Sequence, residues 1–239
     1  MRVLVACEES QAVTKELRRL GHEAYSCDIQ PCSGGHPEWH IMGDALRIIN
    51  PEHYDGRFGI TPSISFYTCD GEYHQFDSRW DMIIAHPPCT YLTNAGAMRL
   101  RVKGEINQER MEKAKEAKKF FMAFLEADCP KKAIENPLPG KIHQLPPYSQ
   151  IIEPYMFGDP WKKRTCLWLR GLPPLMATEL VEPQGLWVGA TSSRRDAHVY
   201  SRYALKSNRD SKTRSKTFPG IARAMAEQWA GDAREVQDE

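Results

Sequence analysis

The sequence predicts an α/β fold in which a mostly parallel sheet carries helices on both faces. Three observations predict it: a strand–helix–strand alternation at the N-terminus, a strongly apolar strand at residues 81–85, and a long amphipathic helix at residues 109–127. Units in which a helix connects two strands build parallel sheets. The 239 residues, of which 41% are hydrophobic and 26% charged, fit one α/β domain with a sizeable core.

The N-terminal alternation defines the first elements. Residues 1–6 read as a buried strand, and residues 10–20 follow with apolar side chains at helical spacing. Gly21 stands where a glycine commonly ends a helix. Residues 22–28 then form a second strand, which ends in the acidic side chain of Asp28.

The rest of the chain alternates between loops and short apolar elements. Residues 30–43 are loop-like, Gly43-Asp44-Ala45 opens a short element, and residues 55–79 predict an excursion, such as a hairpin, outside the core. The remaining elements expected are strands at 81–85, 132–134 and 165–169 and helices at 109–127 and 221–230.

Cysteine usage and the N-terminus indicate the compartment. The seven cysteines are odd in number and lack zinc-ligand spacing, so we expect reduced thiols, no disulfide framework and no metal site. No apolar run approaches the ~20 residues that cross a bilayer, and a signal-peptide pattern is missing. We therefore expect a cytoplasmic, monomeric protein with no membrane partner.

Basic side chains are concentrated late in the chain although the net charge is only +1. Residues 161–216 carry twelve lysines and arginines, including Arg194 and Arg195, against four acids, with tryptophan and tyrosine between them. Such a segment is typical of a polyanion-binding surface. A solvated loop with surplus basic residues explains the pattern equally well.

Polar segments follow two of the predicted strands. His86-Pro87-Pro88-Cys89 follows the strand at 81–85, and Glu135-Asn136-Pro137 follows the strand at 132–134. In open parallel sheets, ligands bind at the carboxyl ends of the strands. We therefore expect Cys89 and Glu135 to lie side by side at one edge of the sheet.

Cys89 is the candidate nucleophile. Two prolines precede it, remove two backbone donors and fix the chain just beyond the strand. A cysteine facing a cleft can act as a nucleophile when its thiolate is stabilised. The alternative is a buried structural thiol, but the strand-Pro-Pro-Cys context favours the catalytic interpretation.

Glu135 is the candidate acidic partner. A glutamate in a partly desolvated pocket can hold its proton near neutral pH and donate it to a ring nitrogen. The alternative is a turn or capping carboxylate. Asn136 would act as a local hydrogen-bonding clamp with either role.

Four segments resemble those of DNA cytosine-5 methyltransferases. The Pro-Pro-Cys segment resembles their nucleophile loop, and Glu135-Asn136-Pro137 resembles their Glu-Asn-Val segment. Lys163-Arg164-Thr165 is similar to their Gln-x-Arg-x-Arg segment, and residues 217–229 are similar to their closing helix. The segments occur in the family's order, and the resemblance covers most of residues 1–230. The chain resembles a small, divergent, phage- or prophage-like member, which implies a Rossmann-like, S-adenosylmethionine-dependent methyltransferase fold.

The resemblance implies a covalent mechanism on cytosine in DNA. Cys89 would add to C6 of the base, Glu135 would stabilise the added electrons at N3, and Arg164 would hold O2. A base inside a duplex must be flipped out for this chemistry, which costs a few kcal/mol. Further side chains would contact the substrate, namely Pro88, Asn136, Lys163, Arg194 and Arg195.

The implied donor is S-adenosyl-L-methionine. The resemblance assigns Cys7, Glu8, Ser10 and Pro87 to its binding site, and Glu8 or Glu9 would contact its amino group. Asp28 would bind the ribose hydroxyls and Asp44 would lie near the adenine. The first loop departs from the family, because Cys7-Glu8-Glu9-Ser10-Gln11 lacks the glycines that let the backbone approach the cofactor. Strand-end capping would also explain these acids.

The resemblance divides the chain into three parts. Residues 1–169 would form the catalytic core, residues 170–216 a short basic segment for nucleic-acid recognition, and residues 217–239 a closing helix with an acidic tail. The short recognition segment and the altered first loop keep two alternatives open. One is a transferase acting on a pyrimidine nucleotide or RNA, or using a different donor; the other is a non-catalytic nucleic-acid-binding relative.

Overall fold

The core of the protein is a seven-stranded sheet with strand order β11-β13-β10-β7-β1-β2-β3. The computed structural model describes residues 1–239 except 57–58, 103, 185, 188–214 and 234–239. The sheet strands are β1 (Arg2–Ala6), β2 (Glu23–Asp28), β3 (His40–Met42), β7 (Met82–Ala85), β10 (Lys131–Pro137), β11 (Gln150–Ile152) and β13 (Thr165–Arg170). β3, β2, β1, β7 and β10 are mutually parallel, and only β13 runs antiparallel to its neighbours β10 and β11.

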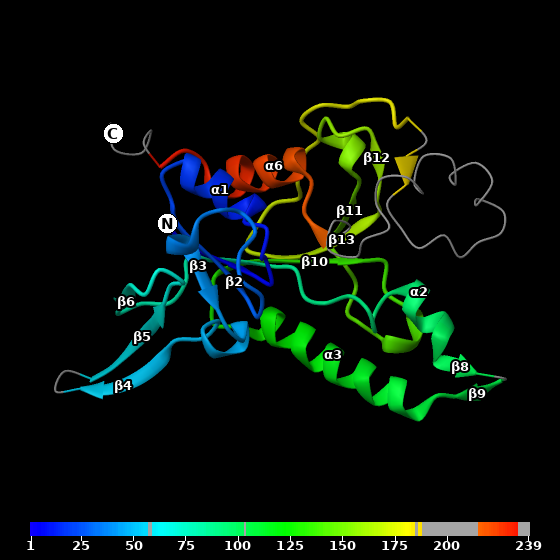
Figure 1. Ribbon diagram of the computed structural model, residues 1–239, viewed down its shortest axis with the longest axis horizontal. Helices are drawn as coiled ribbons and strands as arrows, with labels where there is room; N and C mark the ends of the chain where they lie inside the picture. The colour runs from blue at the N-terminus through cyan, green and yellow to red at the C-terminus, as the bar shows by residue number, and fades with distance from the viewer. Residues whose placement is uncertain (57–58, 103, 185, 188–214, 234–239) are drawn as a thin grey trace.

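Helices cover both faces of this sheet (Figure 1). Helices α1 (Ala12–Arg19) and α6 (Pro219–Ala230) pack against one face, and α3 (Gln108–Glu126) packs against the other. Alternate side chains of β1 show the two sides: Val3 and Val5 join the cluster with α1 and α6, whereas Leu4 joins the cluster with α3. The arrangement confirms the predicted Rossmann-like α/β fold.

The ends of the helices follow from local contacts. α1 begins at Ala12, two residues later than expected, because Gln11 has a left-handed backbone with φ 56° and the Glu8 carboxylate accepts hydrogen bonds from the first turn. Gly21, with φ 82°, follows the end of α1 as predicted. α6 begins at Pro219, before the expected residue 221, because proline suits a first helical turn.

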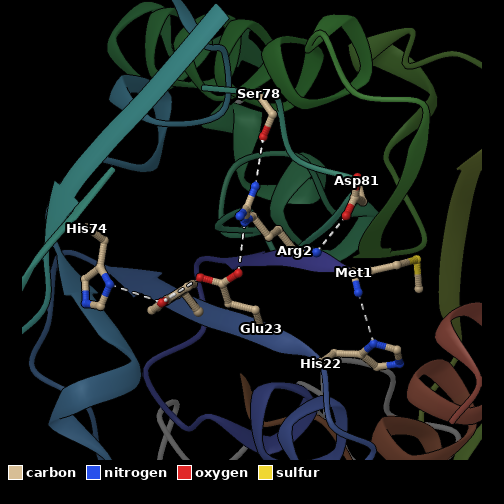
Figure 2. Close-up of polar contacts among 8 residues, drawn as sticks. Met1, Arg2, His22, Glu23, His74, Ser78 and Asp81 are labelled. Atoms are coloured by element: carbon tan, nitrogen blue, oxygen red, sulfur yellow. Dashed lines mark hydrogen bonds and ion pairs between the residues drawn. The ribbon is translucent and has the colours of Figure 1, made fainter. Parts of the chain in front are cut away.

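The segment at 55–79 forms a separate three-stranded antiparallel sheet of β4 (Glu52–Gly56), β5 (Gly59–Tyr67) and β6 (Tyr73–Phe76). The β4–β5 hairpin projects from the core in Figure 1. A polar network ties this sheet to the amino ends of the core strands (Figure 2). The Tyr25 hydroxyl lies 3.2 Å from His74 Nδ1 and donates to Glu23, and Glu23 in turn pairs with Arg2 at 2.9 Å.

Short elements complete the described chain. They are the 3₁₀ helices η1 (Pro37–Trp39), η2 (Ala45–Arg47), η3 (Met98–Leu100), η4 (Lys141–His143) and η5 (Pro154–Met156), helix α2 (Asn94–Ala97), and strands β8 (Arg101–Val102), β9 (Glu105–Ile106), β12 (Trp161–Lys162) and β14 (Leu186–Trp187). Among the described residues, no helix has the length and apolar character that a bilayer crossing requires.

The order of the strands fixes where a ligand can bind. From β1 the chain moves outward through β2 to β3, then returns to the other side of β1 to form β7. Ligands of open α/β sheets bind at such a reversal, outside the carboxyl ends of the strands. Ala6 of β1 and Ala85 of β7 are register partners. The expected ligand site of this chain therefore lies between the residues that follow Ala6 and those that follow Ala85.

Candidate active site

The strand register brings three loops to one edge of the sheet. Ala85, the last residue of β7, pairs with Ala6 of β1 on one side and with Ile134 of β10 on the other. His86 and Glu135 therefore follow directly at neighbouring positions. The sequence predicted Glu135 just after the strand, but the residue lies within β10. The reason is that β10 continues past the end of β7 and keeps pairing with antiparallel β13, where Glu135 lies opposite Leu167.

Two side-chain contacts join the Pro-Pro-Cys loop to β10. Asn136, which is completely buried, donates from Nδ2 to the Pro87 carbonyl oxygen at 3.1 Å. One residue earlier on each strand, His86 Nδ1 lies 3.2 Å from Glu135 Oε2. The sequence predicted that the two segments would lie together, and these contacts show how they are held.

Backbone contacts continue this junction beyond Cys89. The Asn94 amide donates to the Leu138 carbonyl at 2.9 Å, and the Gly140 amide donates to the Leu92 carbonyl at 2.8 Å. Arg110 of α3 adds a side-chain bond to the Thr90 carbonyl at 3.2 Å. The segment that follows the cysteine is therefore anchored to both the segment after β10 and helix α3.

Cys89 opens a tight turn at this junction. Its carbonyl accepts hydrogen bonds from the Leu92 and Thr93 amides, both at 3.1 Å. The side chain is partly exposed and forms no disulfide, whereas Cys166 on nearby β13 is fully buried. Of these two cysteines, only Cys89 is in contact with solvent.

The electrostatic surroundings of Glu135 differ from the sequence-based expectation. Burial raises the pKa of this carboxyl, but the hydrogen bond from His86 and the positive charges of Lys163 and His86 outweigh burial and lower its pKa below the ordinary 4.5. This direction is opposite to the sequence-based expectation that Glu135 keeps a proton near neutral pH. In the protein without substrate, the lowered pKa favours the ionised form of the carboxyl.

Three buried polar atoms at the junction have no hydrogen-bond partner among the residues that the structure describes: His86 Nε2, Glu135 Oε1 and Asn136 Oδ1. Buried polar groups are almost always paired, and an unpaired one points to a water, an ion or a ligand. The chemistry of these atoms, two acceptors and one ring nitrogen, suits the polar edge of a heterocyclic base.

The segment before β13 reaches the same edge because β13 runs antiparallel. Lys163 lies close enough to Glu135 for its charge to lower the carboxyl pKa. Arg164 is placed differently: its side chain is 65% exposed and its Nε lies 3.7 Å from Glu153 Oε1. Of the two basic residues, the structure brings Lys163 toward Glu135, while Arg164 pairs with an acid that follows β11.

The residues expected to bind a cofactor gather at the ends of β1, β2 and β3. Cys7 has a left-handed backbone with φ 59°, so the first loop makes the turn that glycine would favour without a glycine. Burial raises the pKa of the Cys7 thiol, and the charges of Asp28 and Asp44 raise it further, which places both acids near it. Asp28 accepts from the Gln30 amide and Asp44 accepts from the Leu46 amide.

Glu8 is oriented toward the protein. Its carboxylate is buried and accepts hydrogen bonds from the Val13 amide at 2.7 Å, the Thr14 amide at 3.3 Å and the Thr14 hydroxyl at 2.7 Å. Burial raises its pKa although these bonds and His86 oppose the shift. Both oxygens cap α1, so the structure does not support the expected contact of Glu8 with a cofactor amino group. Ser10, half-buried, follows in the same loop.

Among known proteins, the comparisons find likeness to solved structures. Neither the family models nor the curated proteins that were compared match the chain. A solved structure from E. coli, a prophage-encoded protein provisionally described as a DNA modification methyltransferase, is similar with a TM-score of 0.42 and 13% identity. The likeness covers 76% of this chain and 52% of the other, so the chain spans about half the length of that protein.

Two residues at this edge are absent from the sequence-based assignment. Sequence reasoning gave His86 no role of its own, although its place directly after a central strand, beside the strand with Glu135, was a usable signal. Ile29 follows Asp28 and is 77% exposed, which puts apolar surface beside this acid. The predicted substrate contacts Arg194 and Arg195 lie outside the described residues.

Proposed function

We propose that the protein is an S-adenosylmethionine-dependent DNA cytosine-5 methyltransferase. The observation that carries the proposal is the junction in which Asn136 holds the Pro87 carbonyl and His86 holds Glu135. The junction joins the loop that carries partly exposed Cys89, after β7, to the neighbouring strand β10, which carries the largely buried carboxyl of Glu135. Both lie toward the carboxyl edge of the parallel strands, where ligands of open α/β sheets bind. A thiol and a carboxylate in this arrangement suit covalent activation of a pyrimidine ring.

The described residues fit the proposed cofactor at the ends of β1 and β2. Asp28 uses one oxygen for the Gln30 amide, which leaves acceptor capacity for a ribose diol. Exposed Ile29 beside it offers apolar surface to an adenine ring. Cys7, Asp44 and Pro87 would border the same site. S-adenosylmethionine, when bound, supplies an electrophilic methyl group whose bonding pair departs with the sulfur.

The chain's own groups would open and close the reaction. The Cys89 thiolate adds to C6 of cytosine, so an S–C6 bond forms and the C5=C6 pair moves through the ring toward N3, where Glu135 would deliver a proton. C5 is thereby made nucleophilic toward the methyl group that the cofactor would supply. A base then takes the C5 proton, that C–H pair restores the C5=C6 bond, and the S–C6 pair returns to Cys89 as thiolate. Asn136 keeps the thiol at the right place throughout.

DNA is the proposed substrate because cationic groups border the same edge. Lys163 lies beside Glu135 and exposed Arg164 is next to it, and both precede the strongly basic stretch of the sequence. Phosphate contacts from such residues supply most of the sequence-independent affinity for DNA. Pro88, which is exposed next to Cys89, would touch the extruded base.

The direct test is nucleoside mass spectrometry of DNA from a strain that expresses the protein, with a Cys89→Ala strain as control. The proposal predicts 5-methylcytosine with wild-type protein and none with the variant. A modified pyrimidine in RNA or in the nucleotide pool, or a cytosine carrying another group, would instead support the alternative transferase, which the glycine-free first loop favours. Salt-dependent DNA binding without any modified base would support the non-catalytic alternative.

A further inference from the structure

His86 occupies an unusual position between two buried acids. It follows β7 directly, and its backbone amide donates to the Ala6 carbonyl at 2.9 Å, which fixes it against β1. Its side chain is only 8% exposed, and Nδ1 lies 3.2 Å from Glu135 on the opposite neighbour, β10. Glu8, which follows β1, is near enough for the charge of His86 to lower its pKa against the larger effect of burial.

The two acids, Glu8 and Glu135, differ in their hydrogen-bond partners. Glu8 already accepts three hydrogen bonds from the start of α1. Glu135 is bonded to His86 through Oε2, whereas Glu135 Oε1 and His86 Nε2 have no hydrogen-bond partner within the described parts of the chain. The imidazole is therefore hydrogen-bonded to Glu135 through Nδ1, and its buried Nε2 has no competing partner among the described residues.

The charged and titratable groups around this pair are few. Glu8 lies on the β1 side, and Lys163 approaches Glu135 from the segment before β13. Cys166 of β13 is also close, and its pKa is raised to about 12 by burial and by the charge of Glu135. A thiol with that pKa stays protonated near neutral pH, so it does not exchange protons with the pair. Histidine is the side chain suited to do so.

We propose that His86 is a positioning residue that shares one proton with Glu135 and delivers it when a pyrimidine ring accepts electrons. The inference rests on the proposed function and deepens it. As Cys89 bonds to C6, the doubly protonated His86 gives its Nδ1 proton to the Glu135 carboxylate and becomes a neutral imidazole that keeps the Nε2 proton. The neutral carboxyl then turns and donates its proton to N3. When the S–C6 bond breaks and its electron pair returns to the sulfur, N3 releases the proton to Glu135 and His86 recovers it.

The decisive variant is His86→Gln, whose amide can keep a hydrogen bond to Glu135 but cannot carry a transferable proton. The matched control is His22→Gln. His22 is also buried and hydrogen-bonded, at 2.7 Å to the Gly231 carbonyl, but it precedes β2 at the opposite edge of the sheet (Figure 2). Single-turnover methyl transfer to DNA should be followed across about pH 5 to 8.

The wild-type rate should rise with pH as Cys89 ionises and fall again as the pair loses its proton, which gives a bell-shaped profile. His86→Gln should lose the falling limb and be slower by roughly 10²–10⁴, while His22→Gln should keep the wild-type profile. If the His86→Gln enzyme is slow but keeps the bell-shaped pH–rate profile, the proposal is overturned. Loss of a purely structural histidine would slow the reaction by the same factor at every pH.

A second measurement is independent of activity. In protein carrying ¹³C-labelled glutamate side chains, the Glu135 carboxyl can be titrated by NMR without substrate, with Glu135→Gln to assign its signal. His86→Gln should raise the pKa of Glu135, because burial raises this pKa and the substitution removes the positive charge of His86 that opposes it, while Lys163 and Thr165 remain. An unchanged titration would overturn the shared proton even if the enzyme methylates DNA. Failure of wild-type protein to methylate anything, with the titration shifted as expected, would contradict the proposed function and not the pairing.

Discussion

Asn136 Nδ2 donates a 3.1 Å hydrogen bond to the Pro87 carbonyl, so the strand that carries Glu135 directly holds the loop that carries Cys89. The asparagine is completely buried, and the proline carbonyl it holds lies two residues before the thiol. Because the next residue back on each strand, His86 and Glu135, is also in contact, the junction has two parallel links. A substitution at either link should therefore alter the position of the loop that carries Cys89.

Replacement of Asn136 tests this link. Asn136→Ala should lower the free energy of unfolding by about 1–3 kcal/mol, because it removes a buried hydrogen bond and leaves a buried carbonyl without its donor. Urea denaturation measures this, and the rate of Cys89 modification by a thiol reagent reports the loop. Asn50→Ala is the matched control: its side chain accepts from the Asp128 amide at 2.8 Å outside the site. Equal thiol reactivity in both variants would contradict a clamping role.

Ionisation of Glu135 should stabilise the folded protein at neutral pH, and this stabilisation should be lost in acid. Its pKa in the folded protein is lowered from 4.5, burial notwithstanding, by His86 and Lys163. Since the folded state favours the ionised form, Glu135 adds to the free energy of unfolding at pH values above its pKa in the unfolded chain. This stabilisation is lost as the pH falls through its pKa in the folded protein. Wild type should exceed Glu135→Gln by about 1 kcal/mol at neutral pH, and the difference should vanish in acid. A difference that grows below pH 4.5 would be inconsistent with this account.

For Glu8 we expect the opposite pH dependence: its contribution to stability should be largest in acid and should decline as the pH rises. Burial raises its pKa above 4.5 although the Val13 and Thr14 bonds oppose the shift. The folded state then favours the protonated form, so the stability gained from this group is complete below the unfolded pKa and declines as the pH rises through the folded pKa. Glu8→Gln loses the acceptor for Thr14 and should cost about 1–2 kcal/mol in acid, with a smaller cost at neutral pH. Denaturation midpoints at several pH values decide this, and a cost that grows with pH would refute it.

Asp28 is the acid on which cofactor affinity should depend. Asp28→Asn keeps an oxygen for the Gln30 amide but loses the charge that would bind a ribose diol. We expect S-adenosylmethionine affinity by calorimetry to fall roughly tenfold to a hundredfold, equivalent to about 1.5–3 kcal/mol. Asp77→Asn, an exposed acid just after β6, should leave the affinity unchanged. Equal affinities for all three proteins would remove Asp28 from the cofactor site.

Much of the fold follows from periodicity, because the core elements bury one continuous face. The spacing of apolar residues marks α3 within a residue at each end, and the apolar run at 81–85 marks β7. The length of β10 could not be foreseen in this way. Polar Glu135 and Asn136 read as a loop, yet they stay in the strand because antiparallel β13 pairs with them beyond the end of β7.

The candidate site was partly foreseeable for the same reason. Adjacent strand ends predict that Cys89 and Glu135 approach each other, since the carboxyl ends of parallel strands meet at one edge. Charge states and side-chain orientations depend on tertiary neighbours that a single sequence does not reveal. His86 and Lys163 lower the pKa of Glu135 against burial, where a held proton was expected, and Glu8 caps α1, where a cofactor contact was expected.

Covalent trapping tests the central claim most directly, because it asks whether Cys89 and Glu135 act on one pyrimidine ring. Fluorine at C5 replaces the proton that must leave, so the S–C6 bond persists after methyl transfer. With S-adenosylmethionine and duplexes containing 5-fluorocytosine in many sequence contexts, wild-type protein should form a denaturant-resistant adduct whose mass places the DNA on Cys89. Cys89→Ser should form none and Glu135→Gln should form it more slowly by about 10² or more. A folded, cofactor-binding wild type that forms no adduct, or an adduct on another residue, would contradict the account.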